Sequence, residues 1–170
     1  MSPRHVLLPS PIGELTVVAE DGALTHLLMD AAKYRPADTD AFGDEAPPDE
    51  EPFAAAAVQL RAYFAGELRD FDLPLAPRGD AFQQRVWDLL RTIPYGETRS
   101  YGDLARALGD RNLAQAVGTA NGRNPIAVVI PCHRVIGTDG SLVGYAGGLD
   151  RKRFLLTLEE PPADHAGRLF

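Results

Sequence analysis

The sequence predicts an α+β protein in which a small N-terminal sheet with one helix precedes a mostly helical C-terminal domain. Strand-like segments separated by an Asp-Gly turn occur early, whereas helical spacing of apolar residues dominates after residue 80. The charge also changes there. Residues 1–79 carry 6 basic and 14 acidic side chains (net −8), and residues 80–170 carry 11 and 10 (net +1). We therefore expect two domains, 1–79 and 80–170.

The first domain begins with three predicted strands. Residues 13–20 and 22–29 are rich in β-branched and apolar residues, and Asp21-Gly22 between them is a hairpin turn signal. The short apolar run at residues 5–8 adds a third strand.

An acidic, proline-rich segment at residues 30–52 follows, and we expect a loop or a partly disordered connector that is mobile over 36–52. Residues 53–65 have the composition of an amphipathic helix. Gly66 is placed to end it, because glycine adopts the left-handed conformation common after a helix C-terminus.

The second domain opens with a helix that Asp80 and Gln83 can cap reciprocally. Apolar residues then recur at helical spacing until Pro94: Phe82, Val86, Leu89, Leu90 and Ile93.

Two further short helices are predicted close together. Ser100 and Asp103 form a second capping box that opens a helix over 101–108, and another helix covers 113–121 after a turn at Gly109. Such a pair is a helix-turn-helix candidate, although most helix pairs of this kind are ordinary packing units.

The run IAVVI at residues 126–130 predicts a short strand buried on both faces. It leads into Pro131 and Cys132, and would therefore be an active-site strand if the cysteine is functional. A glycine-rich loop at 137–148 and a last helix from Asp150 complete the chain.

Composition excludes several classes of protein. No stretch of about 18 consecutive apolar residues is present, so we expect no membrane span. The N-terminus lacks the apolar region of a signal peptide, and a single cysteine excludes an internal disulfide. The histidines lack metal-ligand spacing, so no metal site is expected. These features favour a reducing, cytoplasmic location.

Cys132 is the principal candidate for chemistry. One interpretation is structural, because free cysteine is often buried and this one follows an apolar run. The other is a nucleophile, for which adjacent His133 would remove the proton and Glu159 would orient the imidazole. Neighbouring side chains on an extended chain point apart, so this second interpretation needs a turn or a bridging water.

Several blocks of the sequence resemble the O6-alkylguanine-DNA alkyltransferases. IPCHRVIG at 130–137 resembles their active-site motif. The similarity extends over residues 82–109, 116–137, 144–148 and 151–159, while the N-terminal half resembles the less constrained N-terminal domain of bacterial members.

The resemblance implies roles for individual residues. Cys132 would accept the alkyl group, His133 would act as its base through a water, and Glu159 would hold and polarise the histidine. The resemblance also implies a hinge asparagine, a tyrosine that assists nucleotide rotation, and residues around the base: Asn124 as the hinge, Tyr101 as the tyrosine, and Val135, Tyr145 and Ala146 as substrate-binding residues.

The implied function is direct reversal of alkyl damage in double-stranded DNA. The helix-turn-helix would enter the minor groove, O6-alkylguanine would flip into the pocket, and one irreversible transfer would follow without a cofactor. O4-alkylthymine is a further possible substrate, and the protein would be cytoplasmic and nucleoid-associated. The implied DNA contacts are Gln115, Ala116, Gly118, Thr119, Asn121, Gly122 and Arg123.

Some of these contacts also have ordinary explanations. Gly118 and Gly122 would allow close approach to DNA, but loose helix packing or a helix end would favour glycine equally. Arg111 and Arg123 could bind phosphate or could simply be exposed.

Gln115 departs from the family pattern, which usually has an arginine that inserts where the flipped base was. Glutamine can intrude and form hydrogen bonds, but it lacks the charge and the planar guanidinium group. The alternatives are therefore a variant impaired in DNA handling, or a non-catalytic protein that only binds the lesion.

Overall fold

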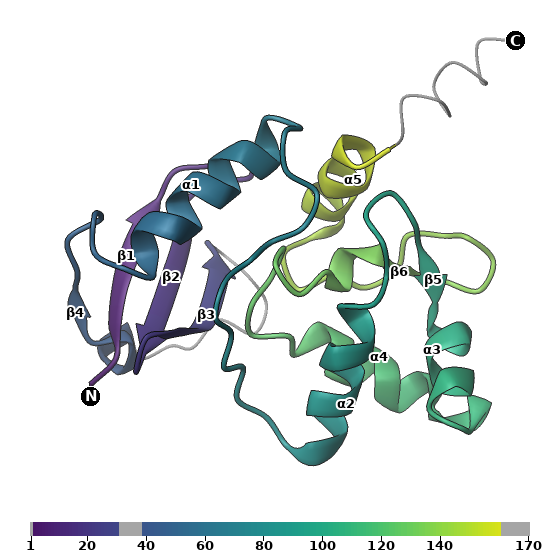
Figure 1. Cartoon of the computed structure of the whole chain (residues 1–170). Helices are drawn as coiled ribbons and strands as arrows, with labels where there is room; N and C mark the ends of the chain where they lie inside the picture. Colours follow the sequence, from purple (N-terminus) through teal and green to yellow (C-terminus); the bar gives the residue numbers. More distant parts are fainter. Residues whose placement is uncertain (1, 31–38, 161–170) are drawn as a thin grey trace, which may run out of the picture.

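The computed structural model describes residues 2–30 and 39–160, and it has the predicted α+β class (Figure 1). A sheet covered by one helix forms one side, and short helices form the other. The strands are β1 Arg4–Leu8, β2 Leu15–Glu20, β3 Ala23–Met29, β4 Asp44–Glu45, β5 Arg99–Ser100 and β6 Val135–Ile136. The α-helices are α1 Phe53–Phe64, α2 Ala81–Leu90, α3 Tyr101–Ala107, α4 Ala114–Gly122 and α5 Leu149–Leu158, and the 3-10 helices are η1 Thr39–Phe42, η2 Arg111–Leu113 and η3 Cys132–Arg134.

The N-terminal sheet has the order β3-β2-β1-β4. The three predicted strands and the hairpin are confirmed. Asp21 and Gly22 both have positive φ angles, 55° and 80°, as a two-residue hairpin turn that follows the strand twist requires.

The prediction of a loop at 30–52 is confirmed at residues 43 and 46–52 and is wrong at residues 39–42 and 44–45. Residues 39–42 form η1, and β4 pairs in parallel with β1 through Arg4 and Asp44. A two-residue strand has too little pattern to be recognised from sequence, and it forms here because β1 offers a free edge. Residues 31–38 lie outside the described part.

Helix α1 packs its buried face against the sheet (Figure 1). The predicted end is confirmed. Gly66 has a φ of 78°, its N–H donates to the Tyr63 carbonyl, and the Glu67 N–H donates to Ala62. This Schellman arrangement satisfies carbonyls that the helix end would otherwise leave without partners.

Both predicted capping boxes are present, at Asp80–Gln83 and at Ser100–Asp103. They fix the starts of α2 and α3, and α3 then packs against α4 across the turn that contains Gly109. The two predicted helices of the candidate helix-turn-helix are thus confirmed as elements.

The predicted buried strand at 126–130 is wrong. Ile126 makes one bridge to Leu27 of β3, and the chain then turns, with the Ile130 N–H donating to the Ile126 carbonyl. Val128 has a φ of 70°, which no strand residue adopts. Ile126, Val128 and Ile130 are all buried within this turn. In the sequence, their apolar run therefore looks the same as a strand that is buried on both faces.

The free edge of β3 joins the two halves of the molecule. Leu24 exchanges backbone hydrogen bonds with Pro74 and Ala76 of the connection before α2. Leu27 does the same with Pro125 and Ala127. The segment that precedes the cysteine is therefore docked directly on the sheet, and one apolar core runs through both halves.

In the described part of the chain, no helix is long and apolar enough to cross a membrane.

Candidate active site

Cys132 lies at the start of η3, directly after Pro131, and its side chain borders a pocket of about 200 Å³. The residue is only 7 % exposed. The pocket lies between β3 and the C-terminal half, and its lining includes residues from both: His26, Leu27, Leu28, Met29, Arg78, Gly122, Arg123, Asn124, Pro125, Ala127, Cys132, Tyr145, Ala146 and Gly147. A thiol at its edge can meet a small molecule or a single base that enters.

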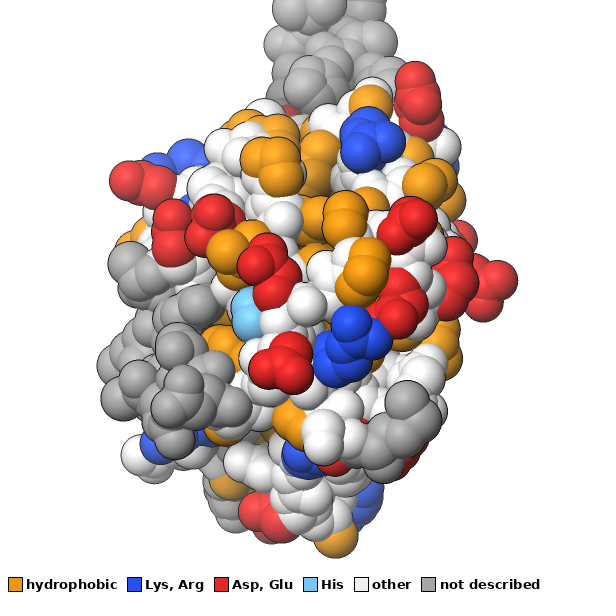
Figure 2. Space-filling model, turned by 90° about the vertical axis from the view of Figure 1, so that its left-hand side faces the viewer, with side chains coloured by type: hydrophobic (Ala, Val, Ile, Leu, Met, Phe, Trp, Pro, Cys, Tyr) orange, Lys and Arg blue, Asp and Glu red, His pale blue; other side chains and the backbone are white. Residues whose placement is uncertain are grey.

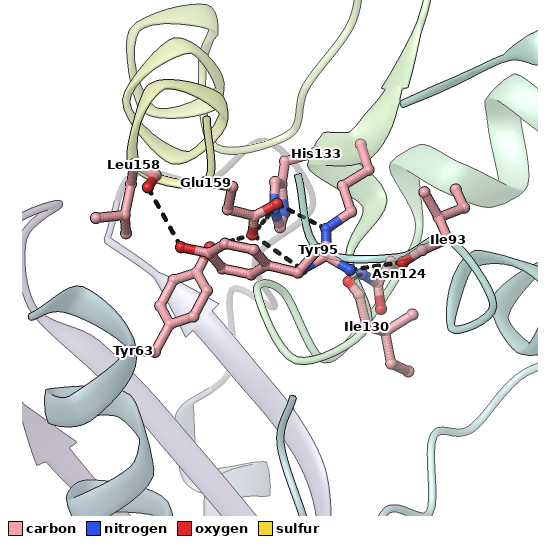
Figure 3. Close-up of polar contacts among 9 residues, drawn as sticks. Tyr63, Ile93, Tyr95, Asn124, Ile130, His133, Leu158 and Glu159 are labelled. Atoms are coloured by element: carbon pink, nitrogen blue, oxygen red, sulfur yellow. Dashed lines mark hydrogen bonds and ion pairs between the residues drawn. The ribbon is translucent and has the colours of Figure 1, made fainter. Parts of the chain in front are cut away.

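Asn124 holds the turn that delivers the cysteine (Figure 3). Its Nδ2 donates to the Ile130 carbonyl at 2.7 Å, and its Oδ1 accepts from the Ile126 N–H at 3.0 Å. The Asn124 side chain therefore bonds to backbone groups of residues 126 and 130, which a neighbouring strand would have bonded if this segment were the expected strand. Its position between α4 and Cys132 is the one the resemblance implies for a hinge.

His133 and Glu159 meet in the interior. Nε2 of His133 lies 2.7 Å from Oε2 of Glu159, which is the C-cap residue of α5, and the two residues are 0 % and 1 % exposed (Figure 3). With a neutral imidazole, the carboxylate places the proton on Nε2 and leaves Nδ1 as the free base. Nδ1 is buried, and it has no hydrogen-bond partner among the described residues.

Burial lowers the pKa of His133, against the opposing influence of Glu159, so the imidazole is neutral near pH 7. Burial alone would raise the pKa of Glu159. Hydrogen bonds and charge from His133 and Arg134 outweigh it and lower that pKa to about 2. The pair is therefore a neutral base held by a permanent anion.

The thiol itself is not activated in the resting structure. Burial raises the pKa of Cys132, while the Asn124 side chain, the Lys152 ammonium group and the Tyr145 hydroxyl act in the opposite direction. A nearby base is therefore needed to generate a thiolate at neutral pH.

Three residues that the sequence analysis did not assign complete the site. Arg134 donates from Nε and Nη2 to the two oxygens of Glu159, at 2.7 and 3.0 Å. Tyr63 of α1 donates its hydroxyl to Oε2 of Glu159. Lys152 donates to the carbonyls of Val135, Val143 and Gly144. Only the fold could reveal them. A sequence does not show whether an arginine or a lysine is buried, or whether the hydroxyl of a core tyrosine meets a carboxylate.

Two of the three predicted substrate-binding residues line the same pocket. Tyr145 and Ala146 line it, and the Tyr145 hydroxyl is buried near the thiol. Val135 begins β6, where its carbonyl accepts from Lys152. Tyr101, at the start of α3, donates its hydroxyl to the Val143 carbonyl at 3.2 Å.

The predicted DNA-contacting residues divide into two groups. Gln115, Ala116, Thr119 and Arg123 are exposed along α4, and Gly118 and Gly122 are half-buried. Asn121 differs from them, because it is 3 % exposed and its Nδ2 lies 3.4 Å from the Cys132 carbonyl. The structure thus places Asn121 at the cysteine rather than on an exposed face.

A methyl group added at Gly118 would meet only the Tyr101 ring, at 3.6 Å, which is ordinary contact. Protein packing therefore does not require glycine at this position. Acidic side chains lie on another face: Figure 2 shows Asp and Glu side chains, with some Lys and Arg, over the face that carries β4, β1 and α1. That face is remote from α4, so it would not repel DNA bound there (Figure 1).

A helix-turn-helix candidate, a pocket bordered by a thiol, and a buried His–Glu pair next to that thiol in the chain are typical of a DNA-binding protein with a candidate cysteine nucleophile. Family models identify it further. Residues 81–161 match the 6-O-methylguanine DNA methyltransferase, DNA binding domain, and residues 4–77 match the 6-O-methylguanine DNA methyltransferase, ribonuclease-like domain. The chain belongs to the 6-O-methylguanine DNA methyltransferase family, whose members repair DNA, and the resemblance seen in the sequence is confirmed.

Relatives agree over nearly the whole chain. The methylated-DNA–protein-cysteine methyltransferase of Mycobacterium tuberculosis is 54% identical over 92% of this chain and 93% of its own. The protein of the same name from Methanosarcina acetivorans is 47% identical over 91% and 97%. The crystal structure of Mycobacterium tuberculosis OGT in complex with DNA has a TM-score of 0.85 and 52% identity, and 92% of each chain is covered.

The buried carboxylate predicts acid sensitivity. The pKa of Glu159 is about 2 in the folded protein against 4.5 for the free side chain, so the unfolded chain binds a proton first as the pH falls. The stability that ionised Glu159 contributes is complete above pH 4.5 and is lost as the pH falls towards 2, by about 3 kcal/mol in total.

Denaturant unfolding of the wild type and of Glu159→Gln across this range measures the contribution. The difference in unfolding free energy between the two proteins should be large at pH 6 and should shrink between pH 4.5 and 2. A difference that stays constant over this range would show that Glu159 is not the titrating group.

Proposed function

We propose that this protein transfers the alkyl group of O6-alkylguanine in double-stranded DNA to Cys132 in a single, irreversible step. The observation that carries the proposal is the orphaned Nδ1 of His133. It is a buried base with its other nitrogen fixed on Glu159, next in sequence to a thiol that borders a pocket. Such a nitrogen needs a partner, and a water that links it to the thiol would provide one.

The chemistry follows from this arrangement. His133 takes the thiol proton through the water, and Glu159 stabilises the imidazolium that forms. The thiolate of Cys132 attacks the alkyl carbon, so the S–C bond forms as the C–O6 bond breaks. The purine leaves as the guanine anion and takes up a proton at N1, while the His133 imidazolium releases the thiol proton and becomes neutral again. In total, one proton moves from the thiol to N1. Substrate and protein hold every reacting atom, so no cofactor is required.

The depth of the thiol favours base flipping. Cys132 is only 7 % exposed, so its sulfur cannot reach a base inside a duplex. The base must therefore leave the stack, at a cost of a few kcal/mol. The exposed positions Gln115, Ala116, Thr119 and Arg123 of α4 offer a surface for the minor groove, with Gly118 allowing close approach. The similar OGT structure in complex with DNA supports binding to DNA.

The flipped base would meet several groups around the pocket. Tyr145 and Ala146 line it, and the buried Tyr145 hydroxyl has hydrogen-bonding capacity to spare. Tyr101 is positioned to contact the nucleotide as it rotates, and the backbone near Val135 would bind a base edge. Asn124 would keep the cysteine turn in place while the base enters.

A second candidate function is a variant impaired in DNA handling. Gln115 lies exposed on α4, at the position where the family usually has arginine. In that case the free base would still react while the duplex would react slowly. A non-catalytic lesion binder is less well supported, because the thiol and its buried base are both present.

A thioether does not release its alkyl group under mild conditions, so transfer should stop after one event per chain. With a tenfold excess of a duplex that carries O6-methylguanine, methyl transfer should stop at one methyl group per protein chain. Cys132→Ala should transfer none. Continued turnover beyond one equivalent would contradict the proposal, and would indicate a hydrolytic mechanism instead.

A further inference from the structure

Tyr63 connects the N-terminal half directly to the site of the proposed transfer reaction. It lies in α1, 96 residues from Glu159 in sequence, and its hydroxyl donates to Oε2 of that carboxylate (Figure 3). The side chain is fully buried, and its ring packs against aromatic neighbours with centroids at 5.2 Å for Phe71, 5.3 Å for Phe64 and 6.3 Å for Tyr95. The hydroxyl is therefore held in one orientation.

The same oxygen of Glu159 also accepts from His133 at 2.7 Å and from Nη2 of Arg134 at 3.0 Å, while Nε of Arg134 occupies the other oxygen. With Tyr63, the carboxylate has four donors, which is close to its full accepting capacity. Three of these contacts come from the active-site turn itself, and Tyr63 alone among them comes from the sheet-and-helix half.

We propose that Tyr63 is a positioning residue for the proposed transfer reaction: its hydroxyl orients Glu159 and limits how strongly that carboxylate draws on His133. The inference rests on the proposed function. A hydrogen bond to a carboxylate oxygen disperses its negative charge, so less remains to stabilise an imidazolium on the same atom. The Tyr63 bond thus keeps His133 neutral and able to accept the thiol proton.

Removing the hydroxyl therefore has a directional consequence. In Tyr63→Phe, Oε2 loses one donor and interacts more strongly with His133, so imidazolium forms at a higher pH. His133 is then already protonated over part of the range in which the wild type reacts. Among the described residues, Tyr63 from α1 and His133 and Arg134 from η3 donate to Glu159, and the Lys152 ammonium group of α5 acts on His133 by its charge. Tyr95 contacts the Arg134 guanidinium group through its ring, at 5.7 Å, and its hydroxyl does not donate to the carboxylate.

Tyr95 provides a matched control. Its hydroxyl donates to the Leu158 carbonyl at 3.3 Å, one residue before Glu159, and not to the carboxylate (Figure 3). Tyr95→Phe removes the same atom from the same aromatic cluster and leaves the donors of Glu159 intact. Both substitutions keep the ring, so packing is preserved in each.

The test is the pH dependence of the transfer rate with free O6-benzylguanine, from pH 5 to 9, for the wild type and both variants. Tyr63→Phe should move the acid limb of the profile to higher pH by about one pH unit, so that its rate falls to about one tenth of the wild-type rate at pH values below the wild-type midpoint. Tyr95→Phe should retain the wild-type limb. Thermal unfolding establishes that all three proteins are folded.

The outcomes separate the two proposals. If the wild type transfers the benzyl group and the two variants have the same acid limb, Tyr63 is only a packing residue and the inference is overturned. An acid limb that moves downward would also overturn it. If the wild type transfers no benzyl group and no methyl group from damaged duplex, the proposed function fails instead.

Discussion

Replacing His133 with glutamine is expected to slow alkyl transfer at pH 7 by a factor of about 10² to 10⁴, which is the usual effect of removing a general base. Glutamine can still donate from its amide to Glu159, so the buried carboxylate keeps a partner at that position. It cannot accept a proton at neutral pH. The thiol pKa is raised by burial, so without the base little thiolate forms.

The loss should depend on pH. At alkaline pH the thiol ionises without assistance, so the rates of His133→Gln and the wild type should approach each other as the pH rises towards the raised pKa of the thiol. Free O6-benzylguanine is the appropriate substrate, because it isolates chemistry from DNA binding. An unchanged rate at pH 7 would exclude His133 as the base. A loss of equal size at every pH in a folded protein would assign it a different role.

Replacing Gln115 with arginine should accelerate reaction with an O6-methylguanine duplex by about tenfold, the effect of roughly 1.4 kcal/mol of added interaction. The new side chain would lie on the exposed face of α4 and would add a cation and a planar group at the proposed DNA surface. Reaction with free O6-benzylguanine should be unchanged, because the pocket and the thiol are not altered.

Val58→Arg is the control for added charge. Val58 is 61 % exposed on α1, far from α4 in the molecule (Figure 1). The two variants have the same net charge, so only a local effect at α4 can distinguish them. If both accelerate the duplex reaction equally, general attraction to DNA explains the gain. If Gln115→Arg has no effect, glutamine already performs the insertion role.

Local signals in the sequence are sufficient to predict most elements of the fold. The Asp21-Gly22 turn and the capping boxes at Asp80 and Ser100 depend on short-range hydrogen bonds and backbone preferences, so their residue types identify them directly. The prediction of a strand at 126–130 is wrong. This run is buried because it docks on β3, and it turns because the Asn124 side chain bonds to its backbone. Neither contact is visible in an apolar pattern.

The candidate site also contains residues that the sequence predicts and residues that it does not. Residue chemistry and the resemblance predict Cys132, His133 and Glu159, and the structure brings the latter two into contact. Tyr63 and Lys152 carry no sequence signal of their own. A tyrosine in an amphipathic helix is usually a core residue, and a lysine beside two arginines is usually exposed. Tyr63 reaches Glu159 only after both halves of the chain have folded together, and Lys152 reaches the carbonyls of Val135, Val143 and Gly144 only after the C-terminal half has folded.

The most direct measurement is the mass of the intact protein after reaction with a duplex that contains a single O6-methylguanine, followed by peptide mapping of the product. The account predicts a gain of one methyl group, located on the sulfur of Cys132, and no gain in Cys132→Ala. A methyl group on any other residue, or no gain with either the duplex or free O6-benzylguanine, would contradict transfer to Cys132.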